Sequence, residues 1–164
     1  MLGQTEIQAK LVELQALTPT GYALAFHVRF TTPTFLFQTY DREWLEHYSQ
    51  HGYVMSDPTV HWGFENRGVC DWEDLKDNDP ANVLVAAAEH GLKFGISWAI
   101  GDESSHSLGS FARSDRKFTT DEISNLITIV TELHNLTNNL QALSPATAAA
   151  LKELSISYTH PADD

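Results

Sequence analysis

The sequence has one cysteine, few basic residues and no long apolar run. Cys70 has no second cysteine with which to form an internal disulfide, as is typical of proteins from a reducing compartment. No apolar stretch approaches the roughly eighteen residues of a membrane span, and the amino terminus lacks the basic-then-apolar pattern of a signal peptide. We therefore expect a cytoplasmic protein with no membrane partner.

Positive charge is also scarce. The 164 residues include 10 Lys and Arg against 22 Asp and Glu, which gives a formal net charge of −12. Such a charge repels phosphate backbones unless the basic residues gather on one face. The nearest cluster, Arg113 to Lys117, contains the acid Asp115. We expect no direct contact between this chain and nucleic acid.

The hydrophobic content of 42% is enough for one folded domain with a sizeable core. Periodicity and turn signals predict an alternation of helices and strands. The predicted helices are 5–17, 41–50, 57–66, 81–90 and 119–139, and the predicted strands are 22–30, 35–40, 94–100 and 107–114, the last two joined by a polar segment at 101–106. This order predicts an α+β fold in which an antiparallel sheet carries helices on both faces.

Three aromatic residues stand four apart, at Tyr40, Trp44 and Tyr48. They would share one face of a helix that begins near Tyr40, and could line an apolar cavity while offering an indole N–H and two hydroxyls. Asp57 follows, and its carboxylate could accept a hydrogen bond from an amide of a ligand. The alternative for these residues is ordinary core packing, with Asp57 as the N-cap before Pro58.

The string Tyr40-x3-Trp44-x3-Tyr48-x8-Asp57-Pro58, then Trp72, then Gly91-Leu92-x2-Gly95, resembles the autoinducer-binding domain of LuxR-type quorum-sensing regulators over nearly the whole chain. The resemblance implies an α/β/α sandwich with a central antiparallel sheet of about five strands. It also implies that the chain binds an N-acyl-homoserine lactone or a similar small amphipathic signal in an apolar pocket. A homodimer without any cofactor is the implied assembly.

The resemblance assigns polar contacts to four residues. Trp44 would donate its indole N–H to the lactone carbonyl, and Asp57 would accept from the acyl-amide N–H. Tyr40 matches a tyrosine that bonds the acyl carbonyl, and Thr59 matches a hydroxyl that some members add at the amide. These roles are those of a binding site and not of a catalytic one.

Three further residues complete the site that the resemblance implies. Tyr48 and Trp72 match pocket walls, with Trp72 closing over the lactone. Ser110 matches a polar residue on a late strand. The predicted ligand-binding set therefore spans the chain from Tyr40 to Ser110.

The resemblance divides the chain into a sensor domain, 1–142, and a linker or tail, 143–164. The segment from Leu143 to Leu154 resembles the opening of a helix-turn-helix domain, but the sequence ends before a recognition helix. Two interpretations stay open. The chain is the sensor part of a longer regulator, or it is a short regulator that acts by dimerising with full-length LuxR-type proteins, for which the apolar stripe from Ile123 to Leu136 could serve as a contact.

An enzyme is the alternative from another class. Cys70 could act as a nucleophile, but no histidine lies near it in the sequence. His47 and His51 are spaced to share a metal, but no glutamate completes a zinc-protease pattern. We expect no catalytic residue and no metal site.

Overall fold

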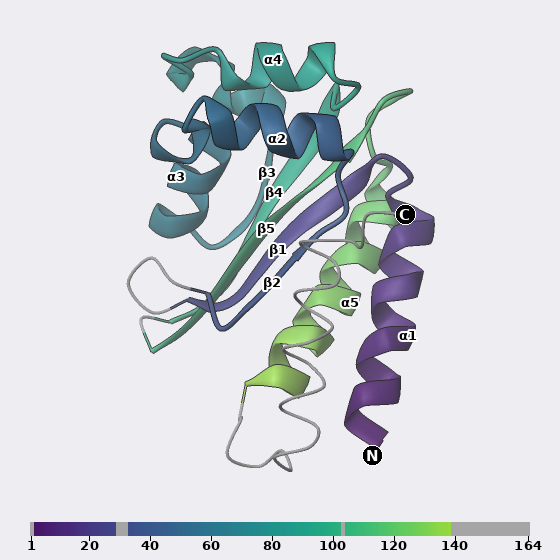
Figure 1. Ribbon diagram of the computed structural model, residues 1–164. Coiled ribbons are helices and arrows are strands. Elements are labelled where there is room, and N and C mark those ends of the chain that lie inside the picture. Colours follow the sequence, from purple (N-terminus) through teal and green to yellow (C-terminus); the bar gives the residue numbers. More distant parts are fainter. Residues whose placement is uncertain (1, 29–32, 103, 139–164) are drawn as a thin grey trace.

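A five-stranded antiparallel sheet with strand order β2-β1-β5-β4-β3 forms the centre of the molecule (Figure 1). The computed structural model describes residues 2–28, 33–102 and 104–138. The strands are β1 (Gly21–Val28), β2 (Phe35–Gln38), β3 (Gly68–Asp71), β4 (Phe94–Asp102) and β5 (Ser105–Arg113). β1 pairs with β2 and β4 pairs with β5 in the antiparallel sense, as expected for the predicted antiparallel sheet.

Two long helices, α1 (Leu2–Leu17) and α5 (Thr120–Thr137), lie side by side on one face of the sheet (Figure 1). α1 buries Ile7, Leu11 and Leu14 completely. α5 begins at a capping box, in which the Thr119 hydroxyl accepts from the Glu122 N–H and the Glu122 carboxylate accepts from the Thr119 N–H. The apolar stripe of α5 packs into this core, so it is not a free docking surface.

The opposite face carries the shorter helices (Figure 1). They are α2 (Arg42–Gln50), η1 (Tyr53–Met55), α3 (Pro58–Glu65), η2 (Trp72–Asn78) and α4 (Val83–Glu89). A second apolar cluster fills the space between these helices and the sheet, and it is built around Trp44, Trp72, Leu84 and Leu92. Helices on both faces of an antiparallel sheet confirm the predicted α+β sandwich.

Several boundaries differ from the sequence prediction. The strand β3 was missed, because it has only four residues at the sheet edge and none of them is fully buried. The polar segment that joins the last two strands is shorter than the predicted 101–106, because β4 continues through Asp102 and β5 begins at Ser105. The predicted helix at 81–90 begins only at Val83, because Asn82 has a left-handed backbone. The predicted tail, 143–164, lies outside the described residues.

A buried histidine pair interrupts the regular ladder of β1. The register between β1 and β5 shifts between Ala25 and Val28, and His27 takes a positive φ of 53°. Its ring lies 4.6 Å from that of His134 on α5. Nδ1 of His27 is 2.7 Å from the Ser105 hydroxyl, and Nε2 is 2.9 Å from the Thr137 hydroxyl. The bulge thus directs the His27 side chain toward the interface between the sheet and α5.

No helix in the described part of the chain is long and apolar enough to cross a membrane.

Candidate ligand-binding site

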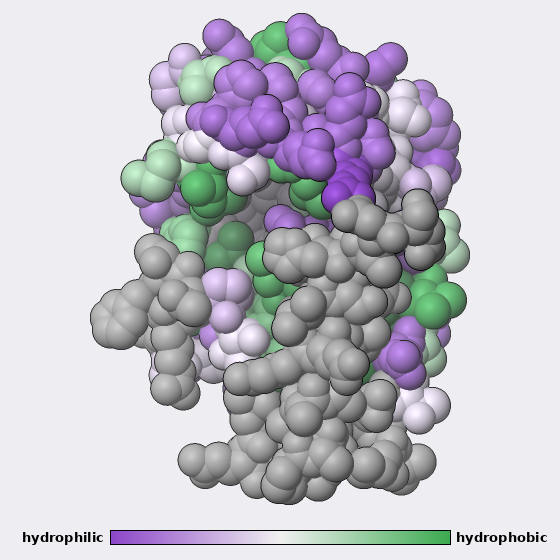
Figure 2. Space-filling model, in the orientation of Figure 1, coloured by the Kyte–Doolittle hydropathy of each residue, from purple (hydrophilic) through white to green (hydrophobic). Residues whose placement is uncertain are grey.

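A cavity of about 260 Å³ lies between the sheet and the shorter helices. Figure 2 shows the corresponding hollow, with hydrophobic residues along its wall beneath a mostly hydrophilic outer surface. Most of the lining is apolar, from Ala23, Leu24, Ala25, Val28, Pro33, Leu36, Leu45, Val54, Val60, Phe64, Val83, Leu84, Ala87, Leu92, Leu108 and Gly109. A cavity of this kind suits a small ligand whose surface is largely hydrocarbon.

All the residues that the sequence singled out as a binding site line this one cavity. They are Tyr40, Trp44, Tyr48, Asp57, Thr59, Trp72 and Ser110. Tyr40 lies between β2 and α2, and Trp44 and Tyr48 lie on α2. Asp57 and Thr59 lie at the start of α3, Trp72 at the start of η2, and Ser110 on β5. The fold therefore gathers side chains that are up to 70 positions apart, as in the Tyr40–Ser110 contact.

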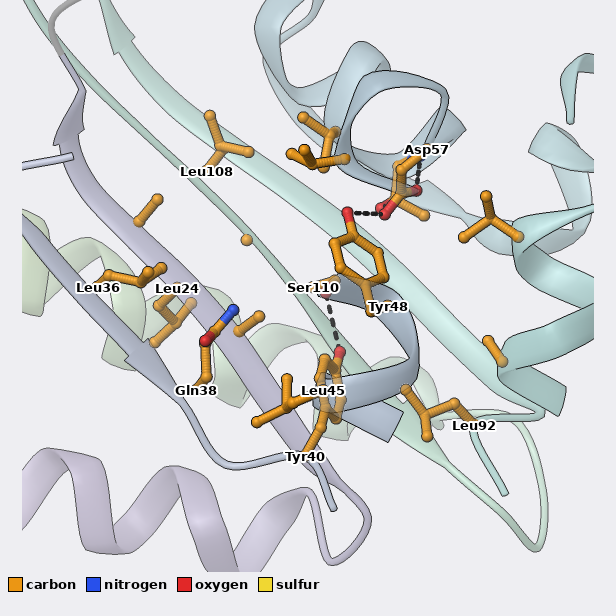
Figure 3. Close-up of a pocket in the computed structure, with 18 of the residues that line it drawn as sticks. Leu24, Leu36, Gln38, Tyr40, Leu45, Tyr48, Asp57, Leu92, Leu108 and Ser110 are labelled. Carbon is orange, nitrogen blue, oxygen red and sulfur yellow. Dashed lines mark hydrogen bonds between the residues drawn. The ribbon is translucent and has the colours of Figure 1, made fainter. Parts of the chain in front are cut away.

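Asp57 is both the N-cap of α3 and a polar group of the cavity. The residue is 6% exposed. Oδ1 accepts hydrogen bonds from the Thr59 N–H at 2.8 Å and from the Thr59 hydroxyl at 2.7 Å. Oδ2 accepts from the Tyr48 hydroxyl at 2.8 Å (Figure 3). The Asp57 side chain can therefore cap α3 and also serve as a hydrogen-bond acceptor in the cavity.

Burial is the main cause of the pKa shifts of three groups that line the cavity. Burial raises the pKa of Asp57, although the hydrogen bonds from Thr59 and Tyr48 act in the opposite direction. Burial and the nearby Asp57 carboxylate raise the pKa of Tyr48, so its hydroxyl stays protonated and donates. Burial likewise raises the pKa of Tyr40. The lining of the cavity therefore includes the neutral phenols of Tyr40 and Tyr48 and the carboxyl group of Asp57.

Tyr40 reaches the cavity without being part of a helix. The expectation that it shares a helix face with Trp44 and Tyr48 is wrong, because α2 begins only at Arg42. Tyr40 instead follows β2, and its hydroxyl lies 2.8 Å from the Ser110 hydroxyl on β5 (Figure 3). The pair places two hydroxyls together on the floor of the cavity, where either can donate to a third group.

Two tryptophans form walls of the cavity. Trp44 is 4% exposed on the inner side of α2, and its ring packs edge-on against Tyr48. Trp72 lies flat against β4 at Gly95, where a Cβ atom would stand only 2.2 Å from the indole ring. The Trp72 indole N–H is buried and has no hydrogen-bond partner within the described ranges. Such an orphan donor is unusual in a folded protein.

Sequence reasoning missed most of the apolar lining and one polar member, Gln38 on β2. The alternation of side chains along β2 is the sequence signal that could have indicated Gln38. Phe35 and Phe37 face the α1 and α5 side, so Leu36 and Gln38 must face the opposite side. Which side holds a cavity is not encoded in that alternation.

The alternative enzyme sites receive no geometric support. Cys70 is half-buried, and burial together with Asp74 and Asp71 raises its pKa, which disfavours the reactive thiolate. The rings of His47 on α2 and His51 just after it lie 4.1 Å apart and tilted by 35°. Within the described residues, no group of three or more histidine, cysteine or acidic side chains is placed to hold a metal ion.

Comparison with known proteins gives consistent matches. Residues 20–152 match the autoinducer-binding domain family. The transcriptional activator protein SolR of Ralstonia nicotianae is 29% identical over 125 residues, which cover 71% of this chain and 52% of SolR. This chain thus spans about half the length of that relative.

Solved structures share the fold at low identity. A structure of SdiA in complex with octanoyl-rac-glycerol matches with a TM-score of 0.56 and 21% identity, over 87% of this chain and 63% of SdiA. The N-acylhomoserine lactone dependent LuxR family factor CepR2 from Burkholderia cenocepacia matches with a TM-score of 0.55 and 17% identity, over 83% of this chain and 94% of CepR2. At these identities the likeness concerns the fold.

Proposed function

Because this chain belongs to the autoinducer-binding domain family of LuxR-type regulators, we propose that it is a sensor domain that binds an N-acyl-homoserine lactone, or a related small amphipathic signal, in the cavity beneath α2. The observation that carries the proposal is the carboxylate of Asp57, which is buried in the wall of a largely apolar cavity. Thr59 occupies Oδ1 with two hydrogen bonds and Tyr48 occupies Oδ2 with one, so Oδ2 can still accept a hydrogen bond from a ligand amide N–H.

The polar groups that the family resemblance singles out each have a role in this proposal. Asp57 accepts from the acyl-amide N–H, and the Thr59 and Tyr48 bonds hold its carboxylate in position. The hydroxyl pair of Tyr40 and Ser110 donates to the acyl carbonyl. These groups recognise the head of the ligand, while the apolar walls receive its acyl chain.

The two tryptophans recognise the ring of the ligand. Trp44 donates its indole N–H to the lactone carbonyl, and the Trp72 ring covers the lactone. The orphan Trp72 N–H supports this placement, since a polar group of the ligand or a water molecule held with it would satisfy that donor.

Titration of thermal stability tests the proposal. A ligand that binds only the native state raises the melting temperature as its concentration increases, and at a hundredfold excess over Kd it adds about 2.7 kcal/mol to the free energy of unfolding. We expect this rise with lactones of at least one acyl length, and not with the ring-opened acyl homoserine, whose carboxylate would stand near Asp57. If no lactone of any length shifts the melting temperature, the proposal fails.

A matched acylglycerol distinguishes two ligand classes. An octanoylglycerol has hydroxyl donors but no amide N–H, and SdiA has been solved with such a molecule. A larger shift with the octanoyl lactone than with octanoylglycerol supports amide recognition by Asp57. A shift with the acylglycerol alone would replace the lactone by an acylglycerol as the signal.

We further propose that the domain self-associates through the outer side of α5. Ser124, Asn125 and Thr128 form an uncharged exposed stretch there, between the exposed acids Asp121 and Glu132, of which Glu132 is paired with Lys10. In a protein of net charge −12, two copies approach with less repulsion through such an uncharged stretch than through an acidic surface.

A further inference from the structure

A row of facing residues crosses the floor of the cavity from one edge strand toward the other. Gln38 on β2 pairs with Ala23 on β1, and Ala23 pairs with Ser110 on β5. Partners in an antiparallel ladder point to the same face of the sheet, so the three side chains lie on the cavity side. Ala23 carries no polar group. Gln38 and Ser110 are therefore the polar residues of this row that line the cavity, and two strand spacings place their Cα atoms about 10 Å apart.

The Gln38 amide points into an apolar environment. Figure 3 shows the side chain directed from β2 into the cavity, on the side where Leu36 and Leu45 also lie. Leu36 is two residues earlier on the same strand, and Leu45 comes from α2. Neither leucine side chain can form a hydrogen bond, whereas a primary amide has two donor hydrogens and an acceptor oxygen. A half-buried amide in such a position is costly unless water or a ligand satisfies it.

The position of Gln38 fixes which part of a ligand it meets. In the proposed binding mode the Tyr40 and Ser110 hydroxyls mark the acyl carbonyl. The next row of the ladder, Leu36–Ala25–Leu108, is wholly apolar and lines the cavity farther along the strands. An acyl chain that leaves the head across Ala23 toward Leu36 passes the Gln38 side chain before it reaches the apolar row.

We infer that Gln38 selects acyl signals with an oxygen substituent close to the amide, such as a β-keto or β-hydroxy group, over unsubstituted chains. The inference rests on the proposed function. The Gln38 side-chain N–H donates to the substituent oxygen, and an unsubstituted chain leaves that donor unmet. A net hydrogen bond of ordinary strength corresponds to a preference of roughly threefold to tenfold in Kd.

Paired ligands of equal length test the inference. We would measure Kd for the β-ketohexanoyl and hexanoyl homoserine lactones with the wild-type chain and with Gln38→Met, which keeps the length of the side chain but removes its donors. Gln50→Met, the same change at the exposed end of α2, is the matched control. We expect the wild type and Gln50→Met to prefer the keto ligand by roughly threefold to tenfold, and Gln38→Met to lose this preference.

The outcomes separate this inference from the proposed function. If both ligands bind and Gln38→Met keeps the wild-type ratio of the two Kd values, the domain is a lactone sensor and Gln38 is not its selector. An equal loss of affinity for both ligands in Gln38→Met would make Gln38 a structural residue and overturn the inference. If neither ligand, nor a lactone of any other acyl length, binds the wild type, the proposed function falls and this inference falls with it.

Discussion

The hydroxyl of Tyr48 donates a 2.8 Å hydrogen bond to Oδ2 of Asp57, and this bond connects the inner side of α2 to the first residue before α3. Oδ1 of the same carboxylate is occupied by the backbone and side chain of Thr59. The acid is therefore fixed in orientation before any ligand arrives. Orientation in advance lowers the entropy that binding has to overcome.

Asp57→Asn separates the two functions of this residue. Asparagine is as good an N-cap as aspartate, so the amide oxygen can keep the bonds to Thr59 and the loss of stability should stay near 1 kcal/mol. The amide nitrogen replaces Oδ2, which removes the acceptor for a ligand N–H. We expect affinity for the best lactone to fall about tenfold to a hundredfold, as measured by calorimetry.

Asp71→Asn is the matched control for that substitution. Asp71 caps η2 with the same geometry, accepting from the Glu73 N–H at 2.8 Å, but it does not line the cavity. Its replacement should leave ligand affinity unchanged. Equal losses of affinity in the two variants would show that Asp57 acts only as a helix cap.

Gly95→Ala tests the position of the Trp72 ring. The new Cβ would stand 2.2 Å from the indole, so the ring has to move away from β4. Overpacking of this kind costs about 1–3 kcal/mol. We expect both a lower melting temperature and a loss of lactone affinity, together with a changed tryptophan emission spectrum.

Gly52→Ala is the control for Gly95→Ala, because it lowers stability without moving Trp72. Gly52 has a φ of +59°, and a Cβ atom there would meet nothing within 4 Å. Alanine in this left-handed conformation costs about 1 kcal/mol without displacing Trp72. Lactone binding that survives in Gly52→Ala but not in Gly95→Ala would assign the effect to the tryptophan. If Gly95→Ala binds as the wild type does, Trp72 does not cover the ligand.

Acid should weaken the fold through His27. Burial, and secondly the neighbouring His134, lower the pKa of His27 from 6.5 to about 4. Between these values the unfolded chain binds a proton that the folded chain does not. Stability is therefore complete above pH 6.5 and is lost as the pH falls toward 4.

Urea denaturation at pH 7 and pH 5 measures this effect. His27 should contribute about 1–2 kcal/mol to the decrease in the free energy of unfolding between these pH values. His27→Asn tolerates the positive φ and should show a smaller decrease, whereas His61→Asn, at an exposed position, should behave as the wild type. An unchanged pH dependence in His27→Asn would contradict the assignment.

Thr128→Glu tests self-association. The residue is exposed on the outer side of α5, and a new carboxylate there meets its own copy across a symmetric interface. We expect sedimentation to show a weaker dimer while lactone affinity stays within error of the wild type. A wild-type chain that remains a monomer at every concentration would exclude the proposed interface.

Local sequence determined much of the molecule. The periodicity of the helix at 119–139, the Asp57-Pro58 helix start and the periodicity of the strands each predict an element that the structure confirms. These signals are local, because capping and side-chain alternation depend on residues only a few positions apart. The resemblance to a known family supplied the ligand-binding set, because local patterns alone favour an ordinary core for these residues.

Only the tertiary structure decided how those residues meet. The bond between Tyr48 and Asp57 and that between Tyr40 and Ser110 join elements whose approach depends on sheet order and helix packing. The same holds for Gln38, whose alternation assigns it a face of the sheet but not a cavity. Trp72 requires a glycine at position 95 for a similar reason, since the distance between η2 and β4 is set by the packing of the whole face. Long-range distances of this kind have no counterpart in the spacing of residues along the chain.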